Sequence, residues 1–101
     1  MFTGISVMCE VGKGTFMSEY FVRIKTYDGT VWEGAVDKEM VFDLEGIPTE
    51  EKYVKGRMYA YLISLDEEKS IALIELPIED STSGRRILVP LSSVRKERVP
   101  A

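Results

Sequence analysis

The chain has 101 residues, of which 45% are hydrophobic and 30% are charged, as expected for one globular domain with a single modest core. Its net charge of −4 argues against a general nucleic-acid binder, because such a protein needs a positive surface to bind phosphates. The chain has no His, which excludes imidazole chemistry. Its single cysteine, Cys9, excludes an internal disulfide, and a chain without disulfides is typical of the reducing cytoplasm.

No apolar run approaches the ~18–20 residues that a membrane-spanning helix needs, and the start of the chain lacks the basic segment of a secretory signal. We therefore expect a cytoplasmic protein. Two cofactor patterns fail on spacing. Lys13 lies between two glycines but lacks the rest of a Walker motif, and the scattered acidic residues of 37–51 do not have the spacing of a calcium loop. We expect no metal or cofactor.

The segment 1–16 begins with alternating apolar residues, which predict a first strand followed by a turn around Lys13. These apolar residues are Ile5, Val7, Cys9 and Val11. An alternative interpretation is that translation starts at Met17 and that residues 1–16 are a leader.

Residues 20–36 contain two alternating runs around Asp28-Gly29, the pattern of a hairpin. A two-residue turn would place Lys25 opposite Trp32, with a charge on the core face. A three-residue loop of residues 27–29, with Gly29 in the left-handed conformation, instead places Ile24 opposite Trp32 and also pairs opposite charges across the strands. We choose the three-residue loop, and it predicts that Trp32 is buried rather than exposed as a ligand platform.

Residues 37–52 lose this alternation. Asp37 can cap one helical turn over residues 38–40, and residues 41–44 are expected to form a short edge strand. Pro48 then marks a polar connection.

Residues 57–65 and 70–76 predict a long hairpin around the charged turn 66–69. Apolar residues occupy both the odd-numbered and the even-numbered positions of residues 57–65, so both faces of this strand need to be covered. One face can be covered by the domain's own core, and the other by further chain or a partner. The expected partner-binding patch consists of Tyr59, Tyr61, Ile63, Ile74 and Leu76.

The end of the chain begins with a Ser-rich loop, residues 79–84, which we expect to be mobile. A short strand over residues 86–89, a tight helical turn over 91–94 and a last strand over 95–99 follow. This region is locally basic, and its residues could contact nucleic acid: Arg85, Arg86, Arg95, Lys96 and Arg98, with Arg57 as a further candidate.

The sequence from Ile87 through Val89, then Pro90 and the apolar-ended turn from Leu91 to Val94, resembles the last two strands of SH3-like small β-barrels. The resemblance implies a mainly β, partly open antiparallel barrel with one or two short helical turns, as a single domain over residues 1–101. The resemblance does not imply the activities of two families that have such barrels. Proline-peptide binders use paired Trp residues, whereas Trp32 is the only one here, and the barrel-shaped reductases use a Gln-Ile-Tyr run where this chain has residues 87–89. The chain also has the general look of proteins from integron gene cassettes.

These observations favour a noncatalytic binding or assembly module that forms homo-oligomers, or binds another protein, through the apolar hairpin face. The alternative is a nucleic-acid module that uses the basic terminal strands. An enzyme is a further alternative, but the sequence contains no nucleophile with an evident base, and Cys9 has the parity of a core residue.

Overall fold

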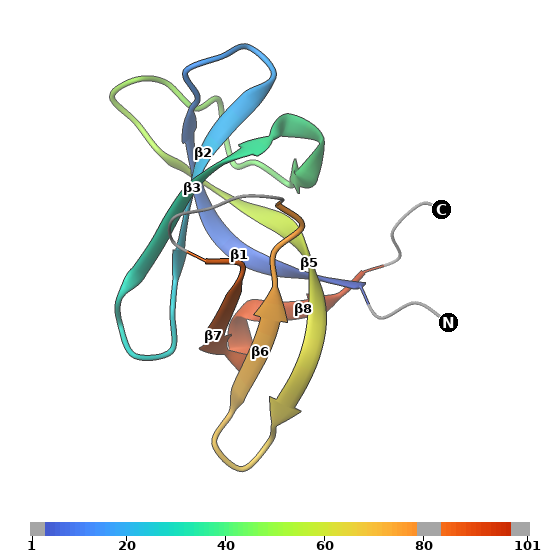
Figure 1. Cartoon of the computed structure of the whole chain (residues 1–101). Helices are drawn as coiled ribbons and strands as arrows, with labels where there is room; N and C mark the ends of the chain where they lie inside the picture. Colours follow the sequence, from blue (N-terminus) through green and yellow to red (C-terminus); the bar gives the residue numbers. More distant parts are fainter. Residues whose placement is uncertain (1–3, 79–83, 98–101) are drawn as a thin grey trace.

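The computed structural model describes residues 4–78 and 84–97, which form eight strands and two single 3₁₀ turns (Figure 1). In chain order these elements are β1 (Gly4–Lys13), β2 (Glu19–Lys25), β3 (Val31–Asp37), η1 (Lys38–Met40), β4 (Val41–Phe42), β5 (Val54–Asp66), β6 (Ile71–Glu75), β7 (Arg86–Pro90), η2 (Leu91–Ser93) and β8 (Val94–Lys96). The fold is mainly β, as the sequence predicts.

One antiparallel sheet of order β3-β2-β1-β5-β6-β7 curls into a nearly closed barrel. Strand β1 pairs along one edge with β5; its other edge pairs first with β8 and then with β2. The two ends of the sheet approach each other where the Tyr27 amide donates a hydrogen bond to the Leu88 carbonyl oxygen, at 2.8 Å. The turn η2 leads from β7 directly into β8, and so returns the chain to β1.

Residues 4–13 form strand β1 of the barrel. Its alternating apolar side chains point inward, and Val7 and Val11 are completely buried. The other strands contribute inward residues in the same alternating manner. The core consists of Ile5, Val7, Cys9, Val11, Val22, Ile24, Trp32, Val36, Val41, Val54, Met58, Ala60, Ala72, Ile74, Leu76, Ile87 and Val89.

The β2–β3 hairpin has the register that the sequence favours: Ile24 pairs with Trp32, and Arg23 pairs with Glu33. Gly29 has a φ of 89°, the left-handed conformation that the three-residue loop requires. Trp32 is buried, only 4% exposed, and its indole N–H donates a hydrogen bond to the Gly84 carbonyl oxygen at 3.1 Å. The exposed-Trp alternative is therefore wrong.

Both helical turns form where they are expected, but the neighbouring strands are shorter. Strand β4 ends after two residues because Asp43 has a left-handed backbone, with a φ of 54°, and such a residue cannot continue a strand. Asp37 occupies the cap position of η1 without a side-chain hydrogen bond. The expected mobile loop, except Gly84, and the end of the expected last strand lie outside the described residues.

The β5–β6 hairpin contains an irregularity in its strand register. Leu62 pairs with Ile74, and Ser64 pairs with Leu73, so that Ile63 is an extra residue in a β-bulge. A bulge shifts the inward and outward parity by one residue. Odd-numbered residues point outward before the bulge, and even-numbered residues point outward after it.

Candidate functional site

The patch predicted from the sequence is only partly on the surface. Tyr61 and Ile63 are 49% and 41% exposed. Tyr59 is half-buried and stacks on Phe42, with ring centroids 4.5 Å apart.

Ile74 and Leu76 were placed on the wrong face by the sequence argument, because both are completely buried in the core. The reason is the register. Tyr61 pairs with Glu75, so the side chains of Tyr61 and Glu75 share one face of the sheet and Ile74 lies on the other.

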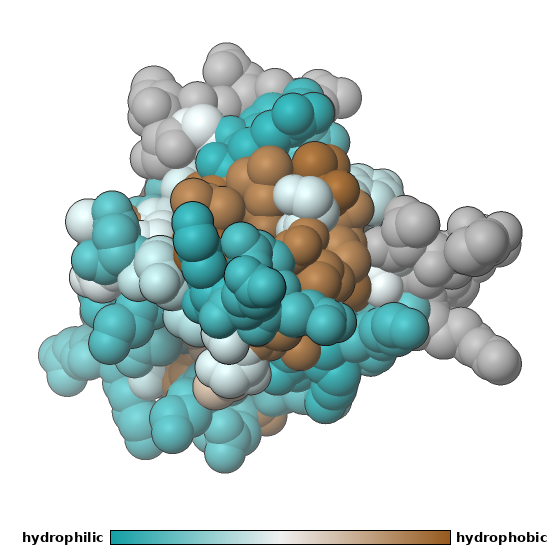
Figure 2. Space-filling model, turned by 90° about the horizontal axis from the view of Figure 1, so that it is seen from below, coloured by the Kyte–Doolittle hydropathy of each residue, from teal (hydrophilic) through white to brown (hydrophobic). Residues whose placement is uncertain are grey.

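Two leucines take the places of these two residues on the outer face. Leu73 and Leu88 pair directly across β6 and β7, and Leu88 is 49% exposed. The bulge brings Ile63 opposite Leu73 together with Ser64. We call Tyr61, Ile63, Leu73 and Leu88 the outer patch. Figure 2 views the end of the molecule that carries the β5–β6 turn, and shows a contiguous apolar area with polar side chains around it.

The rim of the outer patch carries a charged cluster. The Glu75 carboxylate accepts a hydrogen bond from Arg86 Nε at 3.0 Å, and Arg85 Nη2 lies 3.6 Å from its other oxygen. The hydrogen bond from Arg86 is the main cause that lowers the pKa of Glu75. Arg85 and Arg86, two of the arginines of the expected nucleic-acid surface, are thus already paired with a carboxylate.

A second polar cluster joins β1, β5 and β8. The Ser6 side chain is completely buried; its Oγ donates to Glu97 Oε2 at 2.8 Å and accepts from Arg57 Nε at 2.6 Å. Arg57 Nη2 also donates to the Ser93 carbonyl oxygen at 3.0 Å. Arg57 therefore ties the η2 turn to β1.

Arg95 completes this cluster at the surface. Its Nε donates to Glu97 at 2.6 Å and its Nη2 donates to Asp43 at 3.2 Å. The expected basic surface is consequently not one cluster: Arg86 lies on β7 beside β6, whereas Arg95 and Lys96 lie on β8 beside β1. Arg98 is outside the described residues.

Glu97 makes the attachment of β8 sensitive to acid. Hydrogen bonds from Arg95 and from Ser6 lower the pKa of Glu97 below its ordinary 4.5. A carboxyl whose pKa is lower in the folded state stabilises the fold above its unfolded pKa, and the stabilisation disappears as the pH falls through the folded value. Glu97→Gln should therefore lower the melting temperature at neutral pH, and the difference from the wild type should shrink below pH 4.5.

Melting curves of the two proteins between neutral pH and about pH 3 would check this, with Glu39→Gln in the exposed η1 turn as the matched control. A difference between Glu97→Gln and the wild type that stays constant down to the lowest pH would contradict the assigned contacts.

Cys9 is poorly suited to nucleophilic catalysis. It points into the core, and burial raises the pKa of its thiol to about 12, so the reactive thiolate is scarce at neutral pH. In residues 4–78 and 84–97 no group of three or more His, Cys, Asp or Glu side chains could hold a metal ion. Within the same ranges, no helix has the length and apolarity needed to cross a bilayer.

Exposed apolar side chains also occur on two loops. Phe16, Met17 and Ile47 are more than two-thirds exposed and line a shallow hollow of about 390 Å³. Unlike the residues of the outer patch, these three side chains lie on loops and not on strands.

Leu73 and Leu88 were not among the residues predicted for the patch. Both have the outward parity of their strands, and a correct register for β5–β6–β7 would have identified them. That register depends on the bulge at Ile63, for which the sequence gives no clear turn or glycine signal.

Comparison of the chain with protein-family models, with curated proteins and with solved structures gives no match. Nothing in these comparisons connects the chain with integron cassettes. The class of protein that its fold defines is a small, mostly stranded antiparallel barrel with a nearly closed wall, a description compatible with SH3-like small barrels.

Proposed function

We propose that this protein is a noncatalytic assembly module of the SH3-like barrel type that associates with a second copy of itself through the outer patch. The observation that carries the proposal is the direct pairing of Leu73 with Leu88 on an outward strand face, beside exposed Tyr61 and Ile63. Aromatic and other apolar side chains are typical of interface centres.

The surroundings of the outer patch support an interface. Isolated apolar residues are normal on a protein surface, but a contiguous group with a polar rim is less common. Glu75 holds Arg85 and Arg86 at this rim, so the long arginine side chains are partly ordered before a partner binds, which reduces the entropic cost of association. A two-fold dimer would place the same patch on both sides of the interface.

The cellular setting in the proposal is the cytoplasm, supported by the single Cys9 and its burial. Nucleic acid is not part of the proposed function, because Arg85, Arg86 and Arg95 would have to leave carboxylate partners to bind phosphates.

The test is the molar mass in solution of Leu88→Lys compared with the wild type, by size-exclusion chromatography with light scattering. Both copies of a two-fold dimer would carry the substitution, and each buried lysine would remove an apolar contact and add an unpaired charge. We expect the dissociation constant to rise by roughly 100-fold or more.

Val31→Lys is the matched control, because Val31 is also about half exposed, at 53%, and lies on a strand outside the outer patch. We expect it to leave the association unchanged. The proposal fails if Leu88→Lys and the wild type have the same mass at every concentration.

A further inference from the structure

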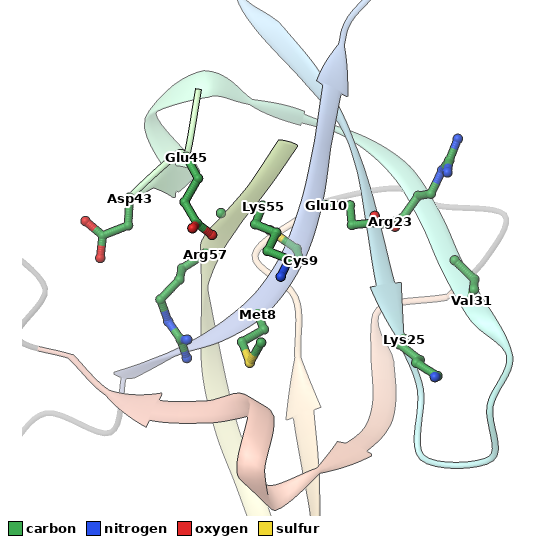
Figure 3. A pocket seen from close by; sticks show the side chains of 11 residues that line it. Met8, Cys9, Glu10, Arg23, Lys25, Val31, Asp43, Glu45, Lys55 and Arg57 are labelled. Carbon is green, nitrogen blue, oxygen red and sulfur yellow. The ribbon is translucent and has the colours of Figure 1, made fainter. Parts of the chain in front are cut away.

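A groove of about 710 Å³ lies on the outside of the barrel, away from the outer patch, with β1 as its floor. It opens where β1 changes partner: Val7 pairs with β8, and Glu10 pairs with β2. Met8 lies between these two positions and is 50% exposed. Figure 3 shows Met8 near the middle of the groove, with Arg57 on one side and Lys25 and Val31 on the other.

Most charges of the groove are balanced among themselves. In the strand register, Glu10 lies opposite Arg23 on one side and opposite Lys55 on the other. Arg23 is also ion-paired with Glu33, at 3.5 Å. Glu45 lies next to Lys55, since its amide donates to the Lys55 carbonyl oxygen. The Asp43 carboxylate, at the edge of the groove, is held by Arg95 at 3.2 Å.

The charge balance differs at the level of Met8, where two cations have no carboxylate in contact among residues 4–78 and 84–97. Among the residues that the structure describes, Arg57 donates only to uncharged oxygens, those of Ser6 and Ser93. Burial, and then the like charge of Arg95, lower the pKa of Arg57, and the opposite influence of Glu97, Cys9 and Asp43 does not fully offset them. Lys25 forms no ion pair with any residue in the described part of the chain.

We propose that this groove binds a small organic anion with an apolar body, of the class of aryl or short acyl carboxylates. Met8 and Val31 would contact the body, while Lys25 and Arg57 would attract the carboxylate. The volume lies within the ~300–1,000 Å³ of small-molecule sites, which combine apolar walls with a few placed charges. Arg57 is already fixed by its hydrogen bonds, so little order is lost when the anion binds.

The proposal is tested with the full chain by NMR titration with 2-naphthoate, octanoate and the uncharged analogue 2-naphthalenemethanol. The chain has five methionines, and Met8→Leu identifies the Met8 methyl signal. We expect saturable shifts at Met8 and at the amides of Lys25 and Arg57 with a carboxylate probe, and several-fold weaker binding of the alcohol.

Lys25→Gln should weaken binding of the carboxylate roughly fivefold, as for the loss of one partly exposed ion pair. Lys13→Gln, whose lysine is paired with Glu50 outside this groove, should leave binding unchanged. Equal affinity for naphthoate and its alcohol overturns the assignment of an anion site. Shifts centred on Leu88, or no saturable shift with either carboxylate, overturn the groove as the site.

Discussion

Ile74→Ala should lower the free energy of unfolding by about 2–5 kcal/mol, because it removes buried carbon atoms and leaves a cavity in the core. Ile74 is completely buried. Leu73→Ala, at the next position of β6, should cost much less in the monomer, because Leu73 is only partly buried on the outer face. Urea denaturation at low protein concentration, where the monomer dominates, measures both effects.

For self-association we expect the opposite order, with a larger loss of affinity between copies in Leu73→Ala than in Ile74→Ala. Leu73→Ala removes an outer-patch contact, whereas Ile74→Ala leaves that face unchanged as long as the barrel is folded. If Leu73→Ala destabilises the monomer as much as Ile74→Ala does, the assigned register of β6 is wrong.

Gly34→Val should destabilise the barrel by about 1–3 kcal/mol through overpacking. The indole ring of Trp32 lies over Gly34, and a Cβ atom at this position would be 2.5 Å from the ring. Trp32 has to move, although the core and its hydrogen bond to Gly84 hold it. Trp32 is the only tryptophan, so its fluorescence reports the change directly, and we expect the emission of the folded variant to shift to longer wavelength.

Ala35→Val is the matched control for this experiment. Ala35 is the next residue of β3 and is exposed, so a β-branched side chain is accommodated there at little cost. An unchanged emission and an unchanged unfolding midpoint in Gly34→Val would show that Trp32 does not pack on Gly34.

The β2–β3 hairpin was predictable because its signals are local. One register placed Ile24 opposite Trp32 and Arg23 opposite Glu33, and the other placed a lysine opposite the tryptophan. The structure has the register in which apolar and charged partners match. The same holds for the two short helical turns, η1 and η2, where the positions of Asp37 and Pro90 mark the starts.

The outer patch was predicted only in part because its register depends on a bulge. Tyr61 and Ile63 were correctly expected to be exposed, but the bulge shifts which residues of β5 face outward. The neighbours of Tyr61 and Ile63 on β6 depend on the β5–β6 register, which is why Ile74 and Leu76 were predicted wrongly. A strand with apolar residues on both faces does not specify this register.

The charged residues were the least predictable, since their partners are far away in the sequence. Asp43 and Arg95 are 52 positions apart yet form a hydrogen-bonded ion pair. Ser6 and Glu97, at opposite ends of the chain, also form a hydrogen bond. Without the topology that brings β8 to β1, the C-terminal arginines resemble a free basic surface, whereas two of their carboxylate partners lie on other strands or loops.

Self-association through the outer patch is tested most directly by sedimentation equilibrium of the unmodified chain over a wide range of concentrations. We expect the average mass to rise with concentration from that of one chain towards that of two. A mass equal to a single chain at every concentration, up to the highest that remains in solution, would contradict the proposed assembly role.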